Sequence, residues 1–196
     1  MMLGLNDAAI FVIQTLGSLY LLIVLLRFIL QLVRANFYNP LCQFAVKATQ
    51  PLLKPLRRVI PSMFGLDMSS LVLALVVQMA LYAVILLLSG YKVDVLFLAP
   101  WALIGIFSLF LKVLFYAMII SVILSWVAPG SRSPAAELVT QITEPVLAPF
   151  RRIIPNLGGL DISPIFAFIA LQLLQSWLIP RVAYYALMPR ELFGLI

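Results

Sequence analysis

The sequence predicts an all-α membrane protein with four transmembrane helices in two parallel tandem repeats, each with an interfacial amphipathic helical loop. Three observations predict this fold: a very apolar composition, four long apolar runs, and a motif that occurs twice. Of the 196 residues, 64% are hydrophobic and 10% are charged, whereas soluble domains are about half apolar and about a quarter charged. A soluble core of this size does not need so much apolar surface, so we expect no soluble domain.

Four apolar runs have about the length that crosses a bilayer. A helix rises about 1.5 Å per residue, so about 20 residues cross a hydrocarbon core about 30 Å thick. We expect transmembrane helices at about 8–33, 70–88, 103–127 and 164–180. The pattern leaves open whether 95–107 continues the third helix or forms a separate interfacial segment. The N-terminus lacks a basic segment, so we interpret the first run as a retained helix and not as a cleaved signal.

An ordered motif occurs twice, without a gap. The string P-x-x-x-P-x-R-R-x-I-P-x-x-x-G-L-D-x-S covers residues 51–69 and again 145–163, at an offset of 94 residues. A biased composition repeats leucines but not an ordered string of this kind. The sequence therefore predicts two structural repeats, residues 1–90 and 91–196.

Each repeat is interpreted as a helix, a basic loop and a second helix, with loops at 34–69 and 128–163. Two crossings per repeat return the chain to its starting side, so both loops lie on one face and the repeats are parallel. The loops hold most of the basic residues, namely Arg34, Lys47, Lys54, Arg57, Arg58, Arg132, Arg151 and Arg152. The positive-inside rule then predicts a multi-pass protein of the bacterial inner (cytoplasmic) membrane with both loops in the cytoplasm.

The loops also show helix signals. Asn39-Pro40 and Ser133-Pro134 each combine an N-cap residue with proline at the first helical position. The apolar residues that follow share one face, which favours a short basic helix lying in the membrane interface. We expect a second short helix to start at Pro51, and at Pro145 in the other loop.

The motif resembles the YggT family of bacterial membrane proteins, which is related to the YlmG proteins of Gram-positive bacteria, cyanobacteria and plastids. The second repeat carries the clearer match, from Ser125-Trp126 through Thr143-Glu144-Pro145 to the segment 158–164. The first repeat is more degenerate, with Leu32 in place of Trp126. The resemblance implies membrane-envelope roles linked to osmotic tolerance, cell division or nucleoid and organelle organisation. It brings no set of catalytic residues.

The basic side chains of the motif are candidates for binding lipids or a partner protein. These candidates are Lys54, Arg57, Arg58, Arg151 and Arg152. One interpretation is headgroup anchoring and topology marking; the other is a specific site for an anionic lipid or a protein. Arginine suits both, because its guanidinium group forks onto phosphate.

Each motif ends in an aspartate and a serine before the next helix: Asp67 with Ser69, and Asp161 with Ser163. We expect them to cap those helices, with a salt bridge to the arginines of the same repeat. The alternative is a pair of carboxylates that line an entrance for cations.

Among the polar residues inside the apolar runs, four are candidate site residues: Gln78, Gln172, Arg27 and Lys112. We expect the two glutamines to face protein and to bond to each other, and the alternative is a permeation path. Arg27 should snorkel toward the cytoplasm or pair with an acid. Lys112 should snorkel as well, unless its helix starts near Trp101, in which case it is central and a functional candidate.

These features favour a non-enzymatic membrane scaffold, with a small oligomeric ion channel or transport component as the alternative. The chain has no histidine and one cysteine, so we expect no His/Cys metal site and no cofactor. Its formal net charge of +6 fits anionic lipid headgroups better than nucleic acid, because the basic residues flank apolar runs. Expected partners are membrane lipids and an unknown membrane or cytoplasmic protein, and a homo-oligomer is a further candidate.

Overall fold

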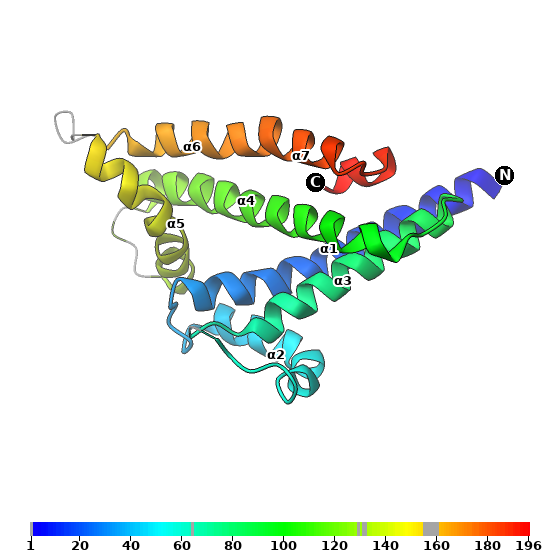
Figure 1. Cartoon of the computed structure of the whole chain (residues 1–196). Coiled ribbons are helices and arrows are strands. Elements are labelled where there is room, and N and C mark those ends of the chain that lie inside the picture. Colours follow the sequence, from blue (N-terminus) through cyan, green and yellow to red (C-terminus); the bar gives the residue numbers. More distant parts are fainter. Residues whose placement is uncertain (1, 64, 129, 131–132, 155–160) are drawn as a thin grey trace.

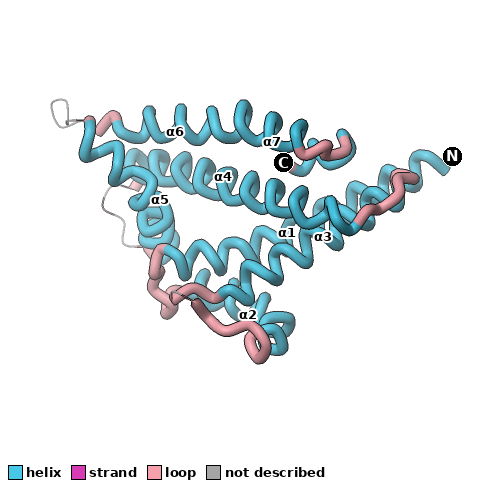
Figure 2. Tube along the Cα trace, in the orientation of Figure 1, coloured by secondary structure: helices cyan, strands magenta, loops and turns pink. Residues whose placement is uncertain are grey.

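The computed structural model describes residues 2–63, 65–128, 130, 133–154 and 161–196, and helices dominate it (Figures 1 and 2). In chain order the elements are α1 (Met2–Leu32), α2 (Pro40–Leu56), α3 (Met68–Leu88), α4 (Val95–Val127), α5 (Pro134–Ile153), α6 (Ser163–Leu173), the π-helix η1 (Leu174–Leu178), α7 (Ile179–Tyr185) and the 3-10 helix η2 (Arg190–Leu195). Across the described ranges no strand is present beyond one isolated β-bridge, between Met63 and Leu66.

Four of the helical segments are long and apolar enough to cross a membrane: Asn6–Leu32, Met68–Leu88, Val95–Val127 and Ser163–Tyr185. The last one joins α6, η1 and α7 in one continuous run. Figure 1 shows the two termini at one end of the bundle, whereas α5 lies at the other end and α2 beside the start of α3. The prediction of an all-α, four-span membrane protein built from tandem repeats is confirmed.

The third span is longer than the prediction of 103–127. Segment 95–107 belongs to α4, which begins directly after Asp94. The Asp94 carboxylate accepts the backbone N–H of Leu96 at 3.0 Å, and this cap starts the helix before Pro100. The proline removes one intrahelical hydrogen bond, and α4 continues through it.

The expectation of a new helix at Pro51 and Pro145 was wrong, because α2 and α5 are each continuous. Pro51 and Pro55 are four residues apart and exposed, so they share the outer face of α2. On that face a carbonyl freed by proline can turn outward, and the helix continues past the prolines.

Two buried apolar clusters each join residues of both repeats. Leu25 and Leu53 from the first repeat belong to the same buried cluster as Met118 and Leu147 from the second. The α3–α4 contact is especially close: an ideal Cβ on Gly105 would collide with the Tyr82 hydroxyl group and would lie 2.9 Å from Gln78 Nε2. The two repeats therefore pack as one unit around the centre of α3 and α4.

Candidate functional site: a charged cluster in each repeat

Arg27 of α1 is almost fully buried, with 5% of its surface exposed. Its Nη1 donates to Thr49 Oγ1 at 2.7 Å and to the Val46 carbonyl oxygen at 3.1 Å. Its Nη2 lies 3.9 Å from the carboxylate of Asp67. Of the two expectations for Arg27, snorkelling or pairing with an acid, the structure shows the pairing. The contacts tie α1, α2 and the start of α3 together.

Asp67 accepts hydrogen bonds from Arg57, whose Nε lies 3.0 Å away, and from Ser70 Oγ at 3.0 Å. Burial alone would raise the pKa of Asp67, but the bonds from Arg57 and Ser70 and the charges of Arg57 and Arg27 outweigh burial and hold this pKa below its usual value. The expected cap is absent, because the Asp67 side chain makes no cap hydrogen bond to α3. Its Oδ2 lies against Arg57 and Arg27 instead.

Ser69 also departs from the capping expectation, since its hydroxyl donates to the Ile60 carbonyl oxygen at 3.1 Å. Gln31 makes a similar link, from Nε2 to the Gly65 carbonyl oxygen at 3.1 Å. Gly65 has a φ of 77°, a conformation that glycine adopts without strain. Its counterpart Gly159 lies outside the described residues. These bonds hold the end of the first loop against α1 and α3.

In the second repeat the equivalent ion pair is more exposed. Arg151 Nε donates to Asp161 at 2.8 Å, and Arg151 Nη1 donates to Glu144 at 2.6 Å. Asp161 also accepts the backbone N–H of Ser163, the first residue of α6, at 2.9 Å. Burial would raise the pKa of Asp161, but the bonds from Arg151 and Ser163 outweigh burial and lower it overall.

The two repeats differ behind these ion pairs. The positions of Arg27 and Gln31 are taken in the second repeat by Ser121 and Ser125. A cavity of about 520 Å³ opens there between α4, α5 and α6. Its lining combines polar groups with an apolar wall: Ser121, Ser125, Arg151, Asp161, Trp126 and Phe168.

The second arginine of each motif pair behaves differently from the first. Arg58 and Arg152 are exposed, and so is Lys54. In the parts of the chain that the structure describes, none of the three has an ion pair or side-chain hydrogen bond, whereas Arg57 and Arg151 are held by aspartates. Both arginines occur in each copy of the motif, so the sequence does not distinguish their roles. The structure shows which one is paired.

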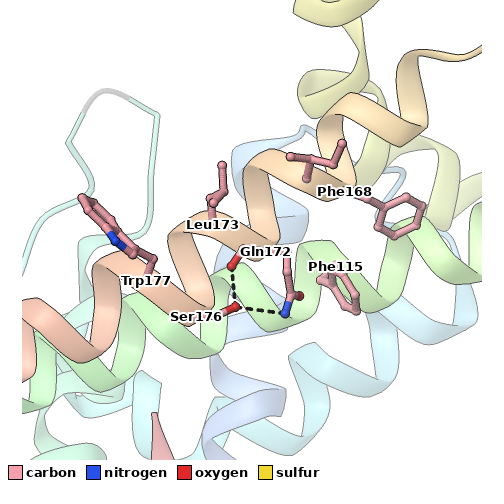
Figure 3. Close-up of a pocket in the computed structure, with 7 residues that line it drawn as sticks. Phe115, Phe168, Gln172, Leu173, Ser176 and Trp177 are labelled. Atoms are coloured by element: carbon pink, nitrogen blue, oxygen red, sulfur yellow. Dashed lines mark hydrogen bonds between the residues drawn. The ribbon is translucent and has the colours of Figure 1, made fainter.

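Gln78 and Gln172, which occupy equivalent positions in the two repeats, do not bond to each other. Gln78 is buried in α3, with 3% exposed, against Gly105 of α4. Gln172 is exposed and donates from Nε2 to Ser176 Oγ at 2.9 Å, beside Phe115 and Phe168 (Figure 3). The reason is packing: α3 contacts both α1 and α4, whereas the fourth span packs mainly on α4 and leaves the Gln172 face uncovered.

The helix-to-helix amide bond occurs at a residue that sequence reasoning missed. Gln175 Nε2 donates to Ser108 Oγ of α4 at 2.7 Å. At the repeat offset the position equivalent to Gln175 is Leu81, so the repeat pattern does not single it out. Gln175 also lies in the π-helix η1, whose wider turn cannot be predicted from the sequence.

Lys112 lies near the middle of α4 and is partly buried. Because α4 starts before Trp101, the condition for a central Lys112 is met. Within the described ranges no ion pair involves Lys112, and no group of three or more His, Cys, Asp or Glu residues is placed to hold a metal ion.

Comparisons with known proteins match this repeat structure. A family model described as CCB3/YggT matches the chain twice, over residues 6–88 and 100–182. An uncharacterized protein of Pseudomonas aeruginosa is 62% identical over 193 residues, which is 97% of this chain and 98% of the relative. The uncharacterized protein YggT of Escherichia coli K12 is 37% identical over 168 residues, which is 84% of this chain and 86% of the relative. No solved structure matches the chain.

Proposed function

The chain belongs to the CCB3/YggT family of membrane proteins, and we propose that it is a non-enzymatic scaffold of the bacterial inner membrane. In this proposal its two basic loops face the cytoplasm and bind anionic lipid headgroups and a partner protein. A role in osmotic tolerance or cell division is what the resemblance of the motif implies. The relatives are themselves described as uncharacterized, and the proposed binding is inferred from the loops.

The observation that carries the proposal is that the first arginine of each pair is bound to an aspartate, whereas the second is exposed. Arg57 and Arg151 are held by aspartates of their own repeat, so they serve the fold. Arg58 and Arg152 stay exposed on the same helical loops, within one residue of those anchors. An exposed guanidinium group without an ion pair in the described part of the chain is suited to a phosphate oxygen. Basic side chains at the membrane surface each contribute about 1 kcal/mol of attraction to anionic lipids.

The loops also have the form of a membrane-surface element. Leu41, Phe44 and Leu52 are exposed on α2, although they are large and apolar. The buried side of the same helix packs through Cys42, Ala45 and Leu53. An amphipathic helix that exposes apolar side chains next to basic ones is typical of the bilayer interface.

The test compares two triple variants of the full-length protein in detergent micelles that contain a trace of phosphatidylglycerol. Lys54→Gln with Arg58→Gln and Arg152→Gln removes three exposed charges from the loops. The matched control, Lys92→Gln with Arg181→Gln and Arg190→Gln, removes three charges from the opposite end of the bundle. We expect the first variant alone to lose bound phosphatidylglycerol, measured by native mass spectrometry. An equal loss in both variants would reject the proposal.

The alternative, a small ion channel or transport component, is favoured by one observation, the central position of Lys112 in α4. The two motif glutamines give it no support, since Gln78 is buried between helices and Gln172 lies on an outer face. Ion flux through reconstituted vesicles discriminates between the two functions. Robust flux that Lys112→Met abolishes would favour the channel.

A further inference from the structure

We propose that the cavity of the second repeat binds one phospholipid that carries an amine in its headgroup, with the ammonium group at Asp161 and an acyl chain in the cleft between α4 and α6. This inference goes beyond the proposed function, because it concerns a single site on the side of the bundle and not the exposed basic loops. It follows from comparing the two repeats position by position.

The second repeat lacks the buried cation of the first. In the first repeat, the guanidinium group of Arg27 fills the space between Asp67 and Thr49. In the second repeat, the equivalent position is Ser121, which lines the cavity. The aspartate remains as Asp161, and so the acceptor is present without the second cation.

The threonine is also retained. Thr143 is 2% exposed, and its hydroxyl donates to the Val139 carbonyl oxygen at 2.9 Å, as that of Thr49 donates to the Ala45 carbonyl oxygen at 2.7 Å. Thr49 Oγ1 additionally accepts from Arg27. Thr143 Oγ1 receives no donor from any residue that the structure describes.

The second step concerns charge. The cluster of the first repeat combines Arg27 and Arg57 with Asp67, which leaves one positive charge in excess. The cluster of the second repeat combines Arg151 with two acids, Asp161 and Glu144, which leaves one negative charge in excess. The reversal has two sources, because serine replaces Arg27 and Glu144 stands where the first repeat has glutamine. A ligand that completes the second cluster must therefore bring a cation.

The remaining lining of the cavity indicates what else the ligand contains. Away from Asp161 the cavity wall is apolar, with Met118, Trp126, Ile165 and Phe168. Phe168 also lines a neighbouring cleft of about 490 Å³, which continues along the fourth span past Leu173 to Trp177 (Figure 3). From Ser163, the first residue of α6, to Trp177 the helix rises about 21 Å. Two apolar clefts that meet at Phe168 and follow the fourth span over this length fit an acyl chain, and a small soluble cation would leave them empty.

The phosphate has a donor in the same place. Arg151 uses Nε for Asp161 and Nη1 for Glu144, and within the described chain its Nη2 has no partner. In a phospholipid with an ethanolamine headgroup the phosphate and the ammonium are neighbours, so one headgroup can reach both Arg151 and Asp161. Charge-assisted hydrogen bonds of this kind are the stronger ones in proteins.

The experiment measures binding of phosphatidylethanolamine and of phosphatidylglycerol, which lacks the amine, to full-length protein by native mass spectrometry. Ser121→Arg supplies the missing cation from the chain itself, as the first repeat does. We expect it to weaken phosphatidylethanolamine binding by about tenfold or more, equivalent to about 1.4 kcal/mol. Glu144→Gln changes an exposed residue and leaves the core intact. It should weaken phosphatidylethanolamine binding by a smaller factor than Ser121→Arg does.

Two outcomes would overturn the site. One is equal binding of both lipids by the loop variant Lys54→Gln with Arg58→Gln and Arg152→Gln, in which the proposed phosphatidylglycerol sites are removed. The other is unchanged phosphatidylethanolamine binding in both Ser121→Arg and Glu144→Gln. Displacement of the lipid by an arginine-rich peptide at equimolar concentration would also overturn it, because the occupant would then be a protein. The loop variant Lys54→Gln with Arg58→Gln and Arg152→Gln should keep its phosphatidylethanolamine binding. Failure of the loop proposal is therefore distinguishable from failure of this one.

Discussion

The Arg27 guanidinium lies 3.9 Å from the Asp67 carboxylate, and the two side chains are nearly buried although Arg27 belongs to α1 and Asp67 directly precedes α3. The loop helix α2 lies between them in sequence and contributes Thr49 to the same cluster. A buried charge is stable only when it is paired and hydrogen-bonded. The first membrane span and its loop are therefore coupled through one aspartate, a constraint that the second repeat lacks.

Replacing Asp67 should cost far more stability than replacing Asp161. Asp67→Asn leaves Arg27 buried without a counter-charge, and breaking a buried pair in this way costs about 3–5 kcal/mol. Asp161→Asn breaks an ion pair whose arginine is exposed, so we expect about 0–1 kcal/mol. Thermal unfolding of both variants in detergent measures the difference.

The double variant supplies the control for this prediction. Arg27→Met added to Asp67→Asn should recover part of the lost stability, because the orphaned charge is then gone. Equal costs for Asp67→Asn and Asp161→Asn, or no recovery in the double variant, would show that the buried pair does not hold the fold.

The lowered pKa of Asp67 predicts a loss of stability in acid. The carboxylate contributes stability that is fully present above its unfolded pKa, about 3.9, and that contribution is lost as the pH falls through the lower folded pKa. The free energy of unfolding should thus be level between about pH 5 and 7 and fall below about pH 4. Asp67→Asn should flatten this fall, and an identical pH profile in the variant would contradict the assignment.

Much of the fold could be predicted, because its determinants are local. Apolar runs of fixed length give the spans, and an ordered motif repeated at one offset gives the parallel repeats. Boundaries were less certain: the start of α4 depends on the Asp94 cap, which the apolar pattern alone does not resolve. The predicted helix break at Pro51 was wrong for a similar reason. Whether a proline ends a helix depends on which face of the helix it occupies.

The candidate site was less predictable than the fold. Arg57 and Asp67 lie in one motif, so a salt bridge between them could be anticipated from their spacing. The contact from Arg27 to Thr49 joins two helices, and no local pattern indicates it. The glutamine pairing failed because repeat symmetry in sequence does not imply equal burial: α3 has neighbours on two sides, and the fourth span has a free face. The roles assigned to the basic residues remain predictions.

A side chain at Gly105 should destabilise the junction of the two repeats. In Gly105→Ala the new methyl group collides with the Tyr82 hydroxyl group, which is fully buried and has no room to withdraw. Overpacking of this kind costs about 1–3 kcal/mol. Gly17→Ala meets only the end of the Leu81 side chain, at 2.6 Å, and should cost less. Thermal unfolding should rank the two variants in that order, and the opposite order would refute the packing argument.

The orientation proposed from the basic loops can be tested by cysteine labelling. Cys42 gives a low background, because it is buried and because burial, followed by the charge of Glu137, raises the pKa of its thiol. An impermeant maleimide applied to intact spheroplasts should label Lys92→Cys and not Ser62→Cys. Ser62 and Lys92 are both exposed, so accessibility to water does not separate them. Labelling of Ser62→Cys alone would invert the proposed orientation.

Lys112 tests whether the centre of α4 serves the fold or another purpose. A lysine at the centre of a membrane helix costs about 2.5–3.5 kcal/mol on insertion scales, and no acid within the described residues pairs with Lys112. Lys112→Met should therefore raise the unfolding temperature, whereas Lys92→Met, at the exposed turn between α3 and α4, should leave it unchanged. If the protein is a scaffold, ion flux through vesicles should stay at background in the unchanged protein and in Lys112→Met. A fall in unfolding temperature in Lys112→Met would instead mean that the ammonium group is stabilised within the folded protein, by a second copy or a bound lipid.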